Sequence, residues 1–309
     1  MTDPNYIAYG KIHIDNIQQM SRTTSYLGGG GPQAAYGMRL WSDHVGFLTR
    51  SGTDIAPQFE HQLRDMQIDL AGWKRFEDLP TPLVDLIYDE EERLISANIR
   101  DREAWLKMMR TPIPLPGSYQ QAKTLHLVTE WADMPVVQVG LDLQQRGGIF
   151  SLEPLLDNEM WFDEKAMIDL IGKVDCVTPD FPSASRLAGR DTPLEVLKFW
   201  AGLGANMVAI RDGVRGSYVW SKEEDIFWHV PPVPVSNVVD PTGAGNAYGG
   251  GLCVGWTETG DARTAAAYGT TAAYSLLHVP GLPAIHSPEV QAAKNLLQQV
   301  VDSAAELIS

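Results

Sequence analysis

The sequence has few cysteines and no long apolar run. Only two cysteines occur in 309 residues, Cys176 and Cys253, and each lies in an apolar context without a CxxC partner. We therefore expect two buried thiols rather than a disulfide or a metal site. No apolar stretch approaches the roughly 20 residues that a membrane-spanning helix needs. These absences predict a soluble protein of a reducing compartment.

Basic residues are scarce as well. The sequence has 24 lysines and arginines against 39 aspartates and glutamates, which gives a net charge of −15. A nucleic-acid backbone would on average be repelled, so only a local basic patch stays open. The seven histidines form no His-Glu-x-x-His motif, which argues against a dedicated zinc site. The first twenty residues lack the basic start and apolar core of a secretory signal, so we expect a cytoplasmic protein with no nucleic-acid or membrane partner.

What the sequence does contain is an alternation of short apolar runs and amphipathic segments. Strands are expected at 6–17 with a turn at Gly10, and at 45–49, 125–128, 136–141, 174–177 and 207–210. Helices are expected at 32–41, 54–66, 101–109, 163–171, 194–201, 247–256, 261–277 and 288–308. This alternation predicts a parallel sheet with right-handed crossovers, in one large α/β domain or two smaller ones.

In such a sheet, ligands bind beyond the carboxyl ends of the strands. We expect Asp142, Asp180, Arg211 and the turn 240–246 at those ends. Asp15, near the end of the first extended segment, is placed at a strand tip. It is either a turn aspartate or a carboxylate that accepts hydrogen bonds from substrate hydroxyls.

The turn 240–246 is a candidate anion site. Pro241 stops the preceding extended segment, and Gly243 and Gly245 allow a tight turn just before a small-residue helix. Three backbone N–H groups can then point at one anion, and the helix dipole favours negative charge there. These are the N–H groups of Ala244, Gly245 and Asn246.

Other segments carry weaker signals. Glycines 28–31 precede a helix and suit close approach of backbone to ligand, but no strong strand leads into them, which argues against a dinucleotide fingerprint. Glycines 249–251 within a helix indicate close packing. Segments 82–88 and 93–99 predict a hairpin whose acidic turn 89–92 is solvated rather than metal-binding.

With these motifs in view, the chain resembles the ribokinase-like carbohydrate kinases, also called the phosphofructokinase B family, over nearly its full length. Gly-Gly-Gly-Gly-Pro at 28–32 and the segment 45–54 are similar to the N-terminal signature of that family. Asp-Pro-Thr-Gly-Ala-Gly at 240–245 is similar to the more specific C-terminal signature. Residues 210–219 resemble the strand-turn-strand at the nucleotide site, and 141–146 resemble a strand end that faces the phosphates.

The resemblance implies a fold and an activity. The fold is one ribokinase-like α/β domain over 1–309, a doubly wound, mainly parallel sheet with a small β-sheet lid formed by about 11–27 and 82–100. The activity is transfer of the γ-phosphoryl group of ATP, with Mg²⁺, to a hydroxyl of a sugar- or nucleoside-like substrate. A homodimer through the lid is an assembly that this resemblance allows.

The resemblance also implies roles for particular residues. The transferred phosphoryl group would be held by residues of the C-terminal signature: Asp240, Gly243, Ala244, Gly245 and Asn246. The substrate would be bound by residues beside the glycine run and at strand ends: Asp15, Gly30, Gly31, Gln33 and Asp142. The nucleotide would contact the third group, with no protein side chain bound directly to metal: Asp180, Arg211, Gly213 and Gly216.

Three positions depart from the family pattern. Asn246 stands where the family has its aspartate base, Ala34 stands where it has a sugar-binding asparagine, and Ser183 stands where it has a glutamate that organises magnesium. An engineered substitution would explain Asn246 alone, whereas divergence explains all three. The chain is then either a kinase with another base, for which Asp240 or Asp15 is a candidate, or a catalytically silent binding protein.

Overall fold

The computed structural model describes residues 3–19, 22–88, 94–156 and 163–308. A ten-stranded sheet runs through the molecule in the order β14-β13-β12-β11-β10-β9-β8-β1-β4-β5. Neighbours from β11 to β5 are parallel, and β12, β13 and β14 add antiparallel pairs at one edge. The strands are β1 Tyr6–Tyr9, β4 Val45–Gly52, β5 Trp73–Phe76, β8 Thr124–Thr129, β9 Ile149–Pro154, β10 Cys176–Val177, β11 Met207–Arg211, β12 Ser217–Ser221, β13 Phe227–Val230 and β14 Ala305–Glu306.

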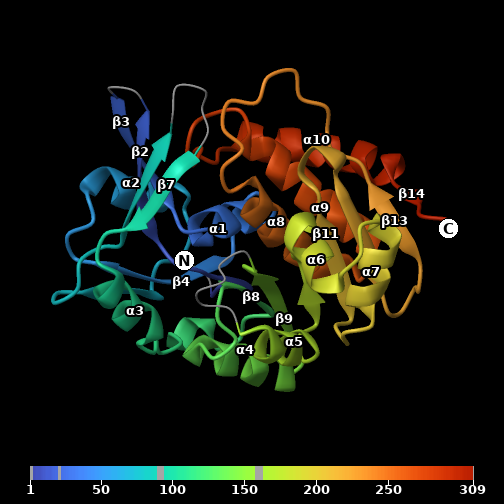
Figure 1. The fold of residues 1–309 in the computed structure, drawn as a ribbon, viewed down its shortest axis with the longest axis horizontal. Coiled ribbons are helices and arrows are strands. Elements are labelled where there is room, and N and C mark those ends of the chain that lie inside the picture. Colours follow the sequence, from blue (N-terminus) through green and yellow to red (C-terminus); the bar gives the residue numbers. More distant parts are fainter. Residues whose placement is uncertain (1–2, 20–21, 89–93, 157–162, 309) are drawn as a thin grey trace.

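Helices cover both faces of this sheet (Figure 1). One layer contains α1 Gly31–Arg39, α2 Pro57–Asp65, α8 Ala244–Thr259, α9 Ala262–Leu276 and α10 Ser287–Ser303. The other contains α3 Arg102–Arg110, α4 Pro135–Gln145, α5 Glu164–Ile171, α6 Phe181–Ala188 and α7 Pro193–Ala201. Short 3₁₀ turns occur at Gly117–Tyr119 and Gly213–Arg215. The predicted doubly wound α/β arrangement is confirmed.

A second sheet has four strands in the order β3-β2-β6-β7. These are β2 His13–Gln19, β3 Arg22–Gly28, β6 Leu83–Tyr88 and β7 Leu94–Ile99. The outer pairs are antiparallel and β2 pairs with β6 in parallel. Figure 1 shows this sheet at the upper left, beyond the α1 end of the large sheet. Its strands match the predicted segments 11–27 and 82–100, with β3 ending one residue later, at Gly28. The action of this sheet as a lid stays a prediction. The predicted turn 89–92 lies outside the described residues.

One predicted strand is wrong. Residues 136–141 lie in helix α4, and the strand of this region is β9, which the sequence analysis missed. Pro135 occupies the first helical position, where its missing N–H costs nothing. The buried residues Val136, Val137, Gly140 and Leu143 recur at helical spacing, and this periodicity outweighs the β-branched composition.

The glycines of α8 allow its backbone to approach α1 closely. A Cβ at Gly250 would overlap the carbonyl oxygen of Ala34, and a Cβ at Gly37 would overlap that of Ala247. On the other side of α8, a Cβ at Gly251 would lie 2.8 Å from the Tyr268 carbonyl oxygen of α9. The close packing predicted for glycines 249–251 is therefore confirmed.

The two cysteines are buried and free, as predicted. Burial raises the pKa of both the Cys176 and the Cys253 thiol, because the apolar surroundings disfavour the thiolate. Within the described ranges, no helix combines the length and apolar character that crossing a membrane requires.

Alanine at Gly250 is expected to destabilise the protein, because its Cβ would overlap a backbone atom that cannot move without separating α1 from α8. The expected loss is about 1–3 kcal/mol, measured by denaturant unfolding. Gly117→Ala is the matched control, since nothing lies within 4 Å of its added Cβ. Equal free energies of unfolding for the two variants would contradict this packing role.

Candidate functional site

Polar side chains from three strands meet on the α8 side of the sheet. In β8 and β9, Leu125, Leu127, Phe150 and Leu152 join the core beneath α3–α7. Because side chains alternate along a strand, the residues between and after them face the other way. These are His126, Ser151 and Glu153, and all three are buried. Arg211 ends β11 on the same side.

Helix α8 starts at this cluster. Gly243 is the N-cap residue with φ 80°, and a Cβ there would overlap Gln33, so only glycine suits the position. Among the described residues, the backbone N–H groups of Gly245 and Asn246 donate no hydrogen bond, as expected for a first helical turn. The Ala244 N–H already donates to the Pro241 carbonyl oxygen at 3.2 Å. Two of the three predicted amides are therefore free for an anion.

Two cavities flank this turn. The first, which we call the small-sheet cavity, has about 500 Å³ and is lined by Asp15, Gly30, Gln33, Gly243 and Asn246 among others. The second, the β11 cavity, has about 410 Å³ and is lined by Asp180, Arg211, Gly213, Arg215 and Gly245 among others. The start of α8 thus contributes Asn246 to one cavity and Gly245 to the other.

Asp15 lines the small-sheet cavity and is 8% exposed. It lies within β2 rather than at a strand tip, because the extended segment continues into the small sheet. His13 Nε2 lies 3.0 Å from its Oδ1. A Cβ at Gly28 would overlap its Oδ2, so that glycine makes room for the carboxylate.

The same cavity contains an ion pair that the sequence analysis missed. Lys11 contacts Glu130 and lies over the Trp105 ring, 5.4 Å from the ring centroid. Glu130 follows β8 directly, 119 positions away from Lys11. A polar residue just after a predicted strand was the available signal. The cavity therefore presents a second carboxylate beside Asp15.

Only some residues of the glycine run 28–31 and of α1 line the small-sheet cavity. Gln33 lines the cavity, and its Nε2 donates to the Leu27 carbonyl oxygen at 2.9 Å. Within the described part of the chain, its buried Oε1 has no hydrogen-bond partner, which is uncommon for a native structure. Gly30 also lines the cavity, whereas Gly31 packs against Gly10. Ala34 is fully buried between α1 and α8 and does not line it.

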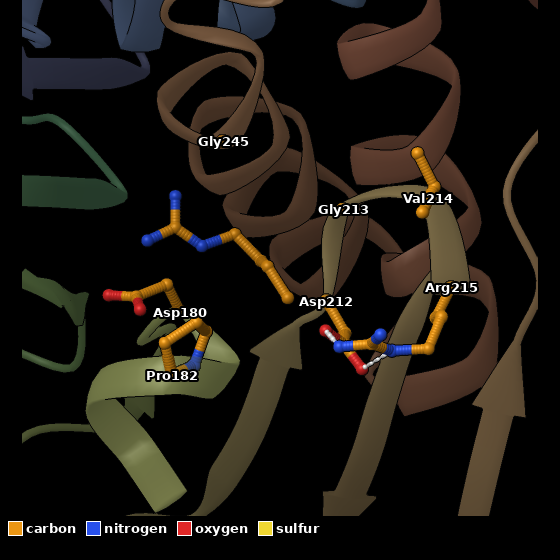
Figure 2. A pocket seen from close by; sticks show the side chains of 8 residues that line it. Asp180, Pro182, Asp212, Gly213, Val214, Arg215 and Gly245 are labelled. Atoms are coloured by element: carbon orange, nitrogen blue, oxygen red, sulfur yellow. Dashed lines mark hydrogen bonds and ion pairs between the residues drawn. The ribbon is translucent and has the colours of Figure 1, made fainter. Parts of the chain in front are cut away.

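Figure 2 shows the β11 cavity, with Gly245 at the start of α8 above Asp180 at the start of α6. Asp180 caps α6, where its Oδ1 accepts from the Ser183 N–H at 2.9 Å. The Arg215 guanidinium donates two hydrogen bonds of 2.7 Å to Asp212. Gly213 lines the cavity at φ 52°.

Arg211 lines the β11 cavity beside the start of α8. Its Nη1 would be 2.5 Å from a Cβ at Gly245, so the guanidinium approaches the free amides of α8. Nη1 also donates to Glu153 Oε1 at 2.7 Å, and Asn246 Nδ2 donates to the same oxygen at 2.6 Å. Glu153 was not among the predicted site residues, because strand β9 was not predicted.

Five predicted site residues line neither cavity: Gly31, Ala244, Asp142, Asp240 and Gly216. Asp142, expected at a strand end, lies exposed in α4 and accepts from Gln138 Nε2 at 2.7 Å. Asp240 is a turn aspartate whose oxygens accept from the Thr242 and Gly281 N–H groups, at 2.9 and 3.0 Å. Gly216, at φ 91°, closes the turn before β12.

A family model described as pfkB family carbohydrate kinase matches residues 1–284. A cytidine kinase of Thermococcus kodakarensis is 25% identical over 259 residues, 82% of this chain and 88% of that protein.

Solved structures share the fold. The Arabidopsis thaliana ribokinase complexed with ribose and ATP has a TM-score of 0.77 and 19% identity, covering 96% of this chain and 99% of that one. A putative ribokinase II of E. coli in complex with ATP and Mg²⁺ has a TM-score of 0.76 and 18% identity, with the same coverage. The predicted ribokinase-like fold class is thus confirmed.

If ATP binds at this turn, as the family resemblance implies, the substitution Gly245→Ala is expected to weaken that binding about tenfold or more, because the added Cβ would lie 2.5 Å from Arg211 Nη1 and displace the guanidinium from the free amides. Isothermal titration calorimetry measures this affinity. Gly117→Ala, remote from both cavities, is expected to bind as the wild type does. If the affinity of Gly245→Ala for ATP is unchanged, the amides at the start of α8 are not part of the anion site.

Proposed function

Because this chain belongs to the pfkB family of carbohydrate kinases, we propose that it transfers the γ-phosphoryl group of ATP to a hydroxyl of a small sugar- or nucleoside-like substrate. The observation that carries this proposal is the start of α8, where free N–H groups lie between two cavities. Donor and acceptor would approach the same amides from opposite sides. Such positioning supplies most of the catalysis in phosphoryl transfer.

The small-sheet cavity suits the acceptor. Asp15, Glu130 and the unpartnered Oε1 of Gln33 all accept hydrogen bonds, which hydroxyl groups donate. Ala97 of β7 and Leu155 after β9 add apolar surface. A polyol with some apolar surface fits this combination.

The β11 cavity suits the nucleotide. The Arg211 guanidinium and the free amides of Gly245 and Asn246 match the charge of the phosphates. Val214, which is 88% exposed, and Pro182 offer apolar surface to a base.

Mg²⁺ would screen the phosphate charge during transfer. The described residues contain no cluster of three side chains able to hold a metal. Asp180 is the carboxylate beside the cavity with one oxygen engaged by a backbone N–H. It suits a contact through water to a metal that is held mainly by the phosphates.

In the proposed reaction the bond between the γ-phosphorus and the β–γ bridging oxygen breaks, and a bond to the acceptor oxygen forms. The acceptor hydroxyl passes its proton to water, because the Asn246 amide does not take up a proton at neutral pH. Asp240 is occupied by backbone N–H groups. A general base contributes about 10²- to 10⁴-fold in rate, so we expect slow turnover. A second candidate, favoured by Asn246 alone, is a catalytically silent protein that binds the same ligands.

ATP turnover across a panel of sugars, nucleosides and polyols tests the proposal. We expect acceptor-dependent ADP release with at least one compound. With that acceptor, Asp15→Ala should raise KM roughly 10- to 100-fold, because a hydrogen bond to a charged group is lost. Asp142→Ala, on the surface of α4, is the control and should leave both kcat and KM unchanged.

Two outcomes would contradict the proposal. If calorimetry shows ATP binding but no compound elicits turnover, the silent binding protein is the better description. If ATP does not bind at all, the assignment of the β11 cavity to the nucleotide is wrong.

A further inference from the structure

A buried carboxylate lies directly behind Asn246. The Glu153 side chain is 1% exposed and comes from β9, beneath the start of α8. Its Oε1 accepts from Arg211 Nη1 at 2.7 Å and from Asn246 Nδ2 at 2.6 Å. Its Oε2 lies 3.4 Å from Nε2 of His126. A Cβ at Gly249 would lie 2.7 Å from this Oε2, so the absence of a side chain at this position of α8 leaves room for the carboxylate.

This contact fixes the direction of the Asn246 amide. An ionised carboxylate only accepts hydrogen bonds, so the amide must turn its NH₂ group towards Glu153. The amide oxygen, Oδ1, then points away from the carboxylate. Asn246 itself lines the small-sheet cavity. Among the described residues Oδ1 has no hydrogen-bond partner. An acceptor hydroxyl can therefore donate to it.

We infer that Glu153 is a positioning residue that orients Asn246 towards the acceptor, and that this pair of positions accommodates one carboxylate only. The first half rests on the proposed function, because it concerns an acceptor hydroxyl. The second half is a statement of charge. The Arg211 guanidinium supplies one positive charge, and Glu153 supplies the matching negative charge.

The substitution Asn246→Asp exposes this limit. It would put a second carboxylate in place of an amide nitrogen that lies 2.6 Å from Glu153 Oε1. Like charges at this distance hold one proton between them, so the pKa of the new carboxyl would rise above the usual value of about 3.9. The groups that face the pair are Arg211 from β11 and His126 from β8, while Gly249 and Gly30 contribute no charge.

A raised folded-state pKa has a definite consequence for stability. The folded state then holds a proton that the unfolded state has released. Stability relative to the wild type is retained at low pH and falls as the pH rises from about 4 through the raised pKa. In the double variant Glu153→Gln with Asn246→Asp, one carboxylate again accompanies Arg211, and this extra loss should disappear.

The experiment compares the wild type, Asn246→Asp, Glu153→Gln and the double variant, with Asp142→Asn as the surface control. Melting temperatures from about pH 5 to about pH 8.5 report the charge limit without reference to activity. We expect the melting temperature of Asn246→Asp to fall with pH more steeply than that of the wild type, and the double variant to follow the wild type. If Asn246→Asp does not fold and the double variant does, the limit is equally supported.

Kinetics report the positioning. We expect Glu153→Gln and Asn246→Asp to lower kcat about tenfold or more with little change in the KM for the acceptor. In Glu153→Gln the Asn246 amide loses its fixed orientation, and in Asn246→Asp the new carboxyl holds a proton beside Glu153, so in neither variant is the acceptor hydroxyl positioned as in the wild type. The double variant should exceed Asn246→Asp in kcat. A wild-type melting profile in Asn246→Asp, or a double variant no better than that single variant, would overturn the inference. If the melting series behaves as expected and even the wild type turns over no acceptor, the proposed function fails while the charge limit stands.

Discussion

The backbone contact between α1 and α8 is the constraint on which the site depends. The two helices approach closely because Gly37 and Gly250 carry no side chain at their crossing. This approach places Gln33 of α1 against Gly243, the first turn of α8. The turn is thereby held over the carboxyl ends of β8, β9 and β11, with a cavity on each side. Larger side chains at Gly37 or Gly250 would separate the two helices and so move the amides at the start of α8 relative to both cavities.

Electrostatics complete what packing begins. The protein carries a net charge of −15, yet the start of α8 combines free N–H groups with the Arg211 guanidinium. Glu153 pairs with Arg211, so that the guanidinium is held beside Gly245 by a buried contact. Because Glu153 balances the charge of Arg211, the attraction for an anion rests on the free N–H groups of α8 and on the guanidinium donors that Glu153 does not engage.

The sequence predicted those parts of the site that depend on local chemistry. Gly243 and Gly245 identify the turn because backbone conformation limits the residues allowed there. A strand was expected at 136–141 because a short apolar run fits a strand as well as a helix, and this error placed Asp142 at a strand end and left Glu153 of β9 unpredicted. The contacts of Glu153 with Arg211 and Asn246 join residues 58 and 93 positions apart, and no local pattern encodes such pairs.

The most direct test of the account is a crystal structure with a non-hydrolysable ATP analogue, Mg²⁺ and an acceptor identified by turnover. The account predicts the γ-phosphoryl group within hydrogen-bond distance of the Gly245 and Asn246 amides, with the acceptor hydroxyl at Asn246 Oδ1. Phosphates bound away from the start of α8, or an acceptor outside the small-sheet cavity, would contradict it.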